Sequence, residues 1–399
     1  THLLKARENF LSIAVPDISD AERLQMSECL DSGWISVGPK VREFERLFAE
    51  YHGVRNAVAT SSCTTSLFIA AKVLGIGEGD KVIVPTITWQ STANIVEQLG
   101  ATPLFADVDR RTMNMDLSSV ERLFLDHGNS VKALIPVHHS GLPAEIESID
   151  AIADSHNVPV IYDAAHAVFS LYDGRMVGSF GKMSCFSFYA TKNLTTGDGG
   201  IITTDDDELA EQCRIWSYHG LPKDSWKRYS AENASPHVQC IVPGYKFNLT
   251  DLQAALGIAQ MSRKDELLAK RNRLVKHYNS ILSGIDWLEI PVHETERGRW
   301  GNHVYVVKIL DEDVDRDAFM SELRKLNVGT NLHFYPVHRN LFYAQKYPHV
   351  SLPVAEWLMD RILTIPLCTK YSNEDLDYVS DALRHVYEKR LAHRKVSAG

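Results

Sequence analysis

A lysine in the stretch CFSFYATKNLTTGDGG, residues 185–200, is the side chain best placed to do chemistry. Lys192 follows an apolar run typical of a β-strand and precedes a glycine-rich turn. An amine at the end of a strand is poised to form a Schiff base with an aldehyde cofactor. The stretch by itself leaves open a simpler interpretation, a surface lysine in a polar turn.

An aspartate in VPVIYDAAHA, residues 158–167, is a partner for such a cofactor. The apolar residues 158–162 predict a buried strand, and Asp163 stands at its carboxyl end, where open α/β sheets bind ligands. A carboxylate there can pair with a protonated pyridine nitrogen, as pyridoxal phosphate (PLP) requires. His166 could hydrogen-bond the phenolic oxygen of the same ring. The alternatives are a helix N-cap for Asp163 and a structural role for His166.

The first third of the chain offers a phosphate site and a ring platform. In residues 61–76, SSCTTSLFIAAKVLGI, hydroxyl residues lead into an apolar helical run, whose free N–H groups and dipole could hold a phosphate. Thr64 and Thr65 are the predicted contacts. Trp89 follows the predicted strand KVIVP and could lie on the pyridine face, with core packing as the alternative.

A series of motifs resembles the DegT/DnrJ/EryC1/StrS family of sugar aminotransferases over roughly residues 10–387. Within the family, the closest resemblance is to the type that aminates UDP-4-keto-arabinose. The resemblance implies the PLP fold type I (aspartate aminotransferase-like), a homodimer with shared active sites, and transamination of a nucleotide-linked keto sugar. The motifs, in order, are SGWISVGP, SSCTTSL, GDKVIVPTITWQSTANIV, DAAHA, SFYATKNLTTGDGG, PGYKFNLTDLQAALG and HFYPVH.

The same resemblance assigns roles to single residues. Lys192 would bind the cofactor and act as general base, and Asp163 would pair with the pyridine nitrogen. His166 stands where the family has Gln or His. Glutamate is the amino donor that the family implies. Phosphate contacts and ring stacking would fall to Ser187, Thr64 and Trp89.

The chain departs from the family pattern in a loop that, as the resemblance implies, would reach the neighbouring subunit. Residues 244–248 are GYKFN where many members have GYNYR, so the phosphate contact across the interface would fall to Lys246 or Asn248. Cys63 and Asp198 replace a small residue and a glutamate, and neither change removes a catalytic group.

Other functions stay open at this point. One alternative is an aminotransferase for a free keto sugar or cyclitol in secondary metabolism. A PLP-dependent keto-sugar dehydratase is a weaker one, because its members have His where this chain has Lys192. A non-catalytic regulator is disfavoured by the intact set of Lys192, Asp163 and Trp89.

Composition narrows the class of partner. With 399 residues and 44% hydrophobic composition, the chain is long enough for a large core. A net charge of −9 argues against nucleic acid and anionic membranes as partners.

Six cysteines without a C-x-x-C motif predict reduced thiols and a cytoplasmic location. We expect no metal site, because adjacent His138 and His139 would point to opposite faces of a strand. We also expect no membrane span or signal peptide.

The elements that must position these residues follow from the apolar pattern. Short strands alternate with helices over residues 57–205, which predicts a large doubly wound, mostly parallel sheet. Helices are expected to end at Gly33 and Gly53. An N-terminal arm and the large domain would occupy residues 1–250. A connector helix capped by Thr250 and a small C-terminal α/β domain would occupy 251–399.

Two segments are expected at the rim of the site. In HFYPVH, the candidate substrate contacts are His333, Tyr335 and His338, each with a structural hydrogen-bonding role as the alternative. The irregular loop 216–242 is long enough to suggest a functional role, and the family resemblance implies that it lies near the nucleotide-sugar entrance of the neighbouring subunit. A strand is predicted over 328–336, and the tail 391–399 is expected to be disordered.

Overall fold

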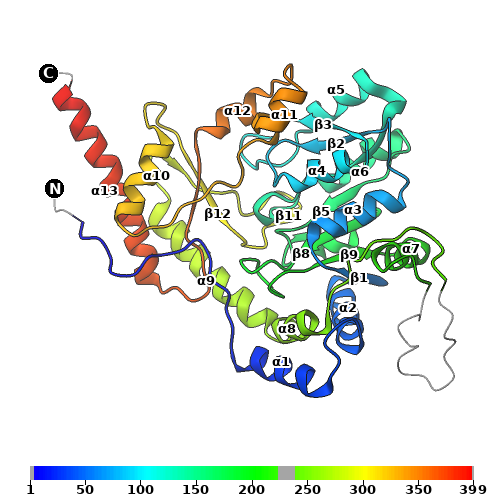
Figure 1. Ribbon diagram of the computed structural model, residues 1–399. Coiled ribbons are helices and arrows are strands. Elements are labelled where there is room, and N and C mark those ends of the chain that lie inside the picture. Colours follow the sequence, from blue (N-terminus) through cyan, green and yellow to red (C-terminus); the bar gives the residue numbers. More distant parts are fainter. Residues whose placement is uncertain (1–3, 223–238, 398–399) are drawn as a thin grey trace.

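Seven strands lie side by side at the centre of the computed structural model, which describes residues 4–222 and 239–397 (Figure 1). They form two hydrogen-bonded groups, β3-β2-β4 and β5-β8-β9-β1, which isolated bridges join from Leu134 to Val160 and from Val137 to Asp163. The strands are β1 (Asn56–Thr60), β2 (Lys81–Pro85), β3 (Thr102–Ala106), β4 (Val131–Leu134), β5 (Ile161–Asp163), β8 (Met183–Ser187) and β9 (Gly200–Thr204).

Strand direction confirms the predicted mostly parallel sheet. The pairs β2–β3, β2–β4 and β5–β8 are parallel, and so are the bridges that join the two groups. Strand β9 runs antiparallel to both of its neighbours, β1 and β8. The parallel strands therefore bring their carboxyl ends, and Asp163 among them, to one edge of the sheet.

Helices cover both faces of this sheet, so the doubly wound expectation is also confirmed. Successive residues of β1 show the alternation: Ala57 and Ala59 pack in one core, and Val58 packs in the core on the other face. The first face is covered by α2 (Pro39–His52), α5 (Leu117–His127), α6 (Ile146–Ser155) and α8 (Asp251–Ser262). The second is covered by α3 (Cys63–Val73), α4 (Ser91–Gln98) and α7 (Asp207–Ser217).

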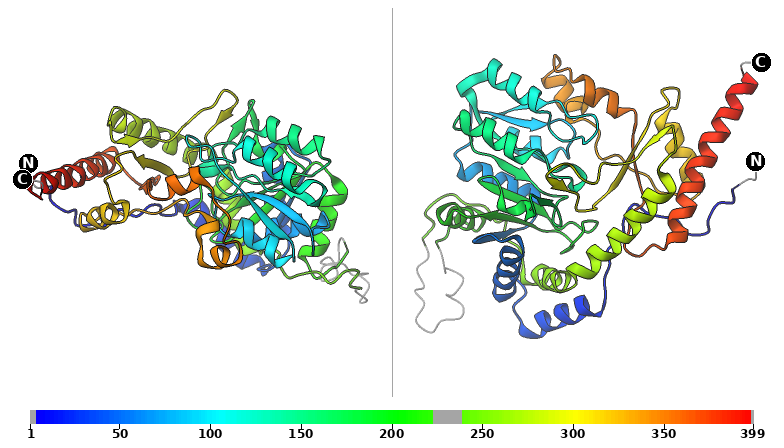
Figure 2. Two further views of the ribbon diagram at one scale, coloured as in Figure 1. Left: turned by 90° about the horizontal axis from the view of Figure 1, so that it is seen from above. Right: turned by 180° about the vertical axis from the view of Figure 1, so that it is seen from behind.

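A second, antiparallel sheet lies beside the first (Figure 2). Its strands are β10 (Leu288–Glu289), β12 (Tyr305–Ile309) and β13 (Ile362–Ile365). Its core takes in residues from α9 (Lys264–Leu282), α10 (Arg316–Lys325) and α13 (Asn373–Ser397), together with Leu11 from the other end of the chain. The remaining elements are α1 (Asp20–Ser32), α11 (Leu341–Lys346), α12 (Pro353–Met359), β6 (Leu171–Tyr172), β7 (Arg175–Met176), β11 (Gly298–Arg299) and the 3₁₀ turns η1 (Gly128–Ser130), η2 (His139–Gly141), η3 (Val177–Ser179) and η5 (Val337–Arg339).

Some predicted elements are right and some are wrong. Gly33 and Gly53 end α1 and α2 in the left-handed conformation, as expected. The strand predicted over 328–336 is wrong: this segment makes only isolated bridges, and β13 supplies the third strand. The tail expected to be disordered continues α13 as far as Ser397. No helix in the described ranges is both long enough and apolar enough to cross a membrane.

The predicted connector helix is divided in two. Thr250 caps α8 through a reciprocal bond with Gln253, as the sequence predicts. The helix then breaks at Arg263, and α9 continues from Lys264. Helix α8 packs on the core of the large sheet, and α9 packs mainly on the core of the small sheet. The division of domains at residue 250 stays a prediction.

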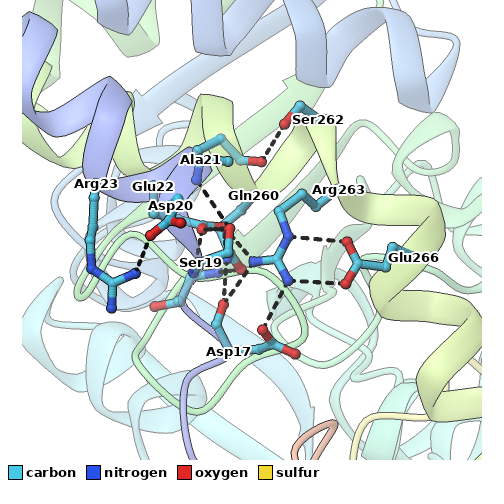
Figure 3. Close-up of polar contacts among 12 residues, drawn as sticks. Asp17, Ser19, Asp20, Ala21, Glu22, Arg23, Gln260, Ser262, Arg263 and Glu266 are labelled. Carbon is cyan, nitrogen blue, oxygen red and sulfur yellow. Dashed lines mark hydrogen bonds and ion pairs between the residues drawn. The ribbon is translucent and has the colours of Figure 1, made fainter.

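Arg263 joins three parts of the chain at this break (Figure 3). Its guanidinium donates to Asp17 Oδ1 at 2.9 Å, to Glu22 Oε1 at 2.8 Å and to Glu266 Oε2 at 3.2 Å. The Glu22 side chain is only 1% exposed. Burial alone would raise the pKa of Glu22, but hydrogen bonds from Ser19 and Arg263 hold it at about 2. Arg263 therefore anchors the start of α1 to the α8–α9 junction.

Replacing Arg263 with Met should lower the free energy of unfolding by about 3 kcal/mol or more, because Glu22 would keep a buried charge without its partner. The pKa values of Asp17 and Glu22 lie at about 2, below their ordinary 3.8 and 4.5. Their ion pairs thus contribute fully above about pH 5, and the contribution is lost as the pH falls toward 2. Urea unfolding should show the variant's deficit shrinking over that range.

The matched control is Arg46→Met. Arg46 pairs with Glu50 on α2, but the two side chains are 58% and 61% exposed. The free energy of unfolding should change by no more than about 0.5 kcal/mol. Equal losses in the two variants would contradict the anchoring role of Arg263.

Candidate active site

Lys192 lies in the turn that joins β8 to β9. Backbone bonds close this turn at its base, from Phe188 N to Gly199 O at 2.9 Å and from Thr196 N to Phe188 O at 3.0 Å. The lysine side chain is half-buried. Burial lowers its pKa to about 8, although Cys63 and Asp163 act in the opposite direction. A larger fraction of this amine than of an ordinary lysine is therefore neutral, and nucleophilic, near physiological pH.

Asp163 stands at the carboxyl end of β5, where the sequence predicts it. It is 4% exposed and accepts hydrogen bonds from Thr92 Oγ1 at 2.8 Å and from Ala165 N at 3.1 Å. Burial raises its pKa, against the effect of these bonds and of Lys192. Thr92 is not among the residues predicted from the sequence, although a hydroxyl in the first turn of the helix after a buried strand could have pointed to it.

Four histidines form a cluster between the two sheets, and the charge of Lys192 acts on three of them, His166, His303 and His333. The ring of His166 lies 4.5 Å from that of His303 and 5.9 Å from that of His333, centroid to centroid. The Nε2 of His139 lies 2.8 Å from the carbonyl oxygen of His333. Since a carbonyl oxygen can only accept, His139 is the donor. Burial lowers the pKa of all four, which keeps the imidazoles neutral next to the lysine.

Of these histidines, the sequence predicts His166 and His333 as site residues and misses His303 and His139. His166 packs on Phe334 at 5.5 Å and leaves Nδ1 buried without a hydrogen-bond partner. In the part of the chain that the structure describes, no group of three His, Cys, Asp or Glu side chains is arranged to hold a metal ion.

The amino end of α3 lies against the start of β9. Ser62 caps the helix, and Thr65 Oγ1 accepts from Ser62 N at 3.0 Å in return. A Cβ on Gly200 would come within 2.4 Å of the Ser62 backbone, so a glycine is required for this approach. Ser187 pairs with Gly200 across β8 and β9. The predicted phosphate contacts Thr64, Thr65 and Ser187 are thus brought to one end of the sheet, with the Thr65 hydroxyl already used in the cap.

The remaining predicted contacts differ in their surroundings. Trp89 is 55% exposed and lies 6.0 Å from the ring of Phe334, which places its indole at the rim of the histidine cluster. Tyr335 is exposed. His338 is buried, with Nδ1 2.6 Å from Thr86 Oγ1 and Nε2 3.2 Å from Glu356 Oε1, which favours its structural alternative.

The loop around Lys246 and Asn248 packs on its own chain. Asn248 bridges to Thr60, two residues before the cap of α3, and Lys246 Nζ lies 4.2 Å from the centroid of the Tyr218 ring. Most of the loop predicted at the substrate entrance, residues 223–238, lies outside the described residues.

Comparison with known proteins agrees with this geometry. A model of the DegT/DnrJ/EryC1/StrS aminotransferase family matches residues 16–384. The spore coat polysaccharide biosynthesis protein SpsC of Bacillus subtilis (strain 168) is 41% identical over 390 residues, which cover 96% of this chain and 99% of SpsC.

Solved structures with the same fold include two of particular use. The putative sugar aminotransferase Spr1654 of Streptococcus pneumoniae, solved in its pyridoxamine phosphate (PMP) form, has a TM-score of 0.88 at 30% identity. The match covers 97% of this chain and 100% of the Spr1654 chain. Spr1654 is also known in a PLP form. DesI, solved in the presence of its TDP-sugar product, has a TM-score of 0.86 at 30% identity. The match covers 98% of this chain and 97% of the DesI chain. The chain therefore belongs to the DegT/DnrJ/EryC1/StrS aminotransferase family and is a PLP-dependent sugar aminotransferase.

Proposed function

We propose that this aminotransferase moves an amino group from glutamate to a 4-keto sugar carried on a nucleotide. The observation that carries the proposal is the half-buried amine of Lys192 near the buried carboxylate of Asp163, at the ligand-binding edge of the sheet. The structure of DesI with a TDP-sugar product supports a nucleotide-linked acceptor. The name of SpsC, a polysaccharide biosynthesis protein, is consistent with an activated sugar.

The described residues fit the cofactor. His166 Nδ1 is a buried polar atom without a partner, which a ring oxygen could satisfy. Asp163 offers a carboxylate to a pyridine nitrogen, and Thr64 and Ser187 stand near the free N–H groups of α3 for a phosphate. Thr65 would contribute mainly through its backbone, because its hydroxyl serves the cap.

When bound, PLP supplies an electron sink for the negative charge that forms at the donor's Cα. Lys192 would bind it through Nζ and then, once displaced, carry the proton from the donor's Cα, for which an amine with a pKa of about 8 is well matched. Asp163 would hold the proton on the pyridine nitrogen. Trp89 would cover one face of the ring and exclude water.

Neighbouring residues complete the proposed site. We assign His333 and Tyr335 to the substrate side, while His338 would act only by supporting this segment. Lys246 and Asn248 would contact the phosphate of a second copy in a homodimer. The cytoplasm suits this enzyme, since all six cysteines lie in described segments as free thiols.

The acceptor can be identified by following the two halves of the reaction. Glutamate should remove the visible absorbance band of the bound cofactor, and a nucleotide-linked 4-keto sugar should restore it, with a 4-amino sugar found by mass spectrometry. Lys192→Ala should do neither, whereas Lys182→Ala, a surface lysine paired with Asp206, should behave as wild type. Recovery with free keto sugars or cyclitols but not with nucleotide sugars would favour the alternative acceptor.

Replacing Asp163 with Asn should lower the turnover number by about 10² or more, because the charge that keeps the pyridine nitrogen protonated is lost. The cofactor should still bind, as measured by its absorbance. Asp150→Asn is the control: Asp150 accepts from Tyr162 Oη at 2.7 Å away from the site, so it should affect stability rather than turnover. Near-normal turnover in Asp163→Asn would move the ring-nitrogen role to another residue.

Mixed dimers test whether Lys246 acts across an interface. If it does, combining Lys192→Ala chains with Lys246→Ala chains at random restores about a quarter of wild-type sites, because each mixed dimer has one site with both lesions and one with neither. Turnover is measured under conditions where each variant alone is nearly inactive. If Lys246 serves its own chain, activity stays flat even though native mass spectrometry detects mixed dimers.

A further inference from the structure

The residue after the active-site lysine connects the lysine turn to the second sheet. Asn193 is 5% exposed and lies between two groups from the segment that leads into β12. Its Nδ2 donates to Gly301 O at 2.7 Å, and its Oδ1 lies 2.9 Å from His303 Nδ1. The proposed function assigns no role to either bond.

The chemistry of these groups determines where the protons are. Gly301 O is a carbonyl and can only accept, so the nitrogen of Asn193 must face it and the oxygen must face His303. Because that oxygen also only accepts, His303 must carry its proton on Nδ1. Burial lowers the pKa of His303, and the charge of Lys192 acts in the same direction. His303 is therefore a neutral imidazole in a single tautomer.

The backbone around His303 is held from a second side. Arg271 on α9 is 5% exposed and donates to His303 O at 2.9 Å and to Asn302 O at 3.1 Å. The backbone N–H of Gly301 donates to Gly141 O at 3.2 Å. The backbone of His303 is thus held from α9 and its ring from the lysine turn, and the ring lies 4.5 Å from that of His166.

We propose that Asn193 and His303 form a positioning pair that sets the place of Lys192 Nζ and of the His166 ring for the aminotransferase reaction. Asn193 is covalently next to Lys192, and His303 packs directly on His166, so one hydrogen bond constrains both. The pair touches neither substrate nor reacting atoms; it acts through its two neighbours. This inference rests on the proposed function for its effect on turnover, but not for its proton arrangement.

The proton arrangement can be measured without turnover. In protein labelled with ¹⁵N-histidine, NMR should show His303 as the neutral Nδ1–H tautomer, with its signals assigned by their loss in His303→Phe. Asn193→Leu should abolish the preference for that tautomer. An Nε2–H tautomer, or a charged ring, in the wild-type protein would overturn the inference whether or not the enzyme turns over.

Three substitutions then separate positioning from stability. His303→Phe keeps a ring but removes the donor, and His303→Asn restores an N–H at the place of Nδ1. Tyr305→Phe is the matched control, because Tyr305 Oη donates to Asn279 Oδ1 at 2.7 Å two residues further along the same segment. The Tyr305→Phe substitution removes one hydrogen bond from a buried side chain that lies outside the site.

We expect His303→Phe to lower kcat by about 10²-fold, as a displacement of about 1 Å at the reacting groups would. The KM for glutamate should change little, and the pH midpoint of the bound cofactor's absorbance band should shift. His303→Asn should recover most of both properties, and Tyr305→Phe should change only the melting temperature. The proposal would be overturned if His303→Phe kept the wild-type kcat and the wild-type pH midpoint of the absorbance band. It would also be overturned if Tyr305→Phe changed both properties as much as His303→Phe does. Failure of the wild type to use any keto sugar would instead count against the proposed function.

Discussion

The burial of an amine near a carboxylate at one edge of the sheet is the constraint on which the rest of this structure depends. Loss of water favours the neutral forms of Lys192 and Asp163, and their mutual attraction favours the charged forms. The balance holds only while both residues keep their places. Asp163 is registered opposite Cys185 in the parallel pair β5–β8, and a slip of one residue would turn its side chain to the other face.

The groups around this pair limit its freedom from several directions. Thr92 and the Ala165 amide hold the carboxylate, and neither would do so if α4 or β5 shifted. Gly200 allows β9 to pass close to the cap of α3, which brings the helix end to the lysine turn. The site is therefore built where β9 approaches the cap of α3 more closely than a side chain at position 200 would permit.

The second sheet contributes to the site through a small number of buried polar bonds. Asn193 and Arg271 both bind the backbone before β12, so the position of the histidine cluster depends on how the two sheets pack. At the far end, Arg263 ties the start of α1 to the α8–α9 junction (Figure 3). These bonds hold together segments that are far apart in the sequence.

The sequence by itself determined the elements and the reacting residues that local patterns encode. Alternating strands and helices predicted the sheet, Gly33 ended its helix because glycine tolerates the left-handed conformation, and the strand before Asp163 marked the ligand-binding edge. Only the tertiary structure decided which distant groups meet. Thr92, His303 and the buried partners of His338 come from other segments, and no local pattern records a hydrogen bond across the fold. The same reason explains β13, because strand pairing in the small sheet depends on long-range packing rather than on the residues of the strand alone.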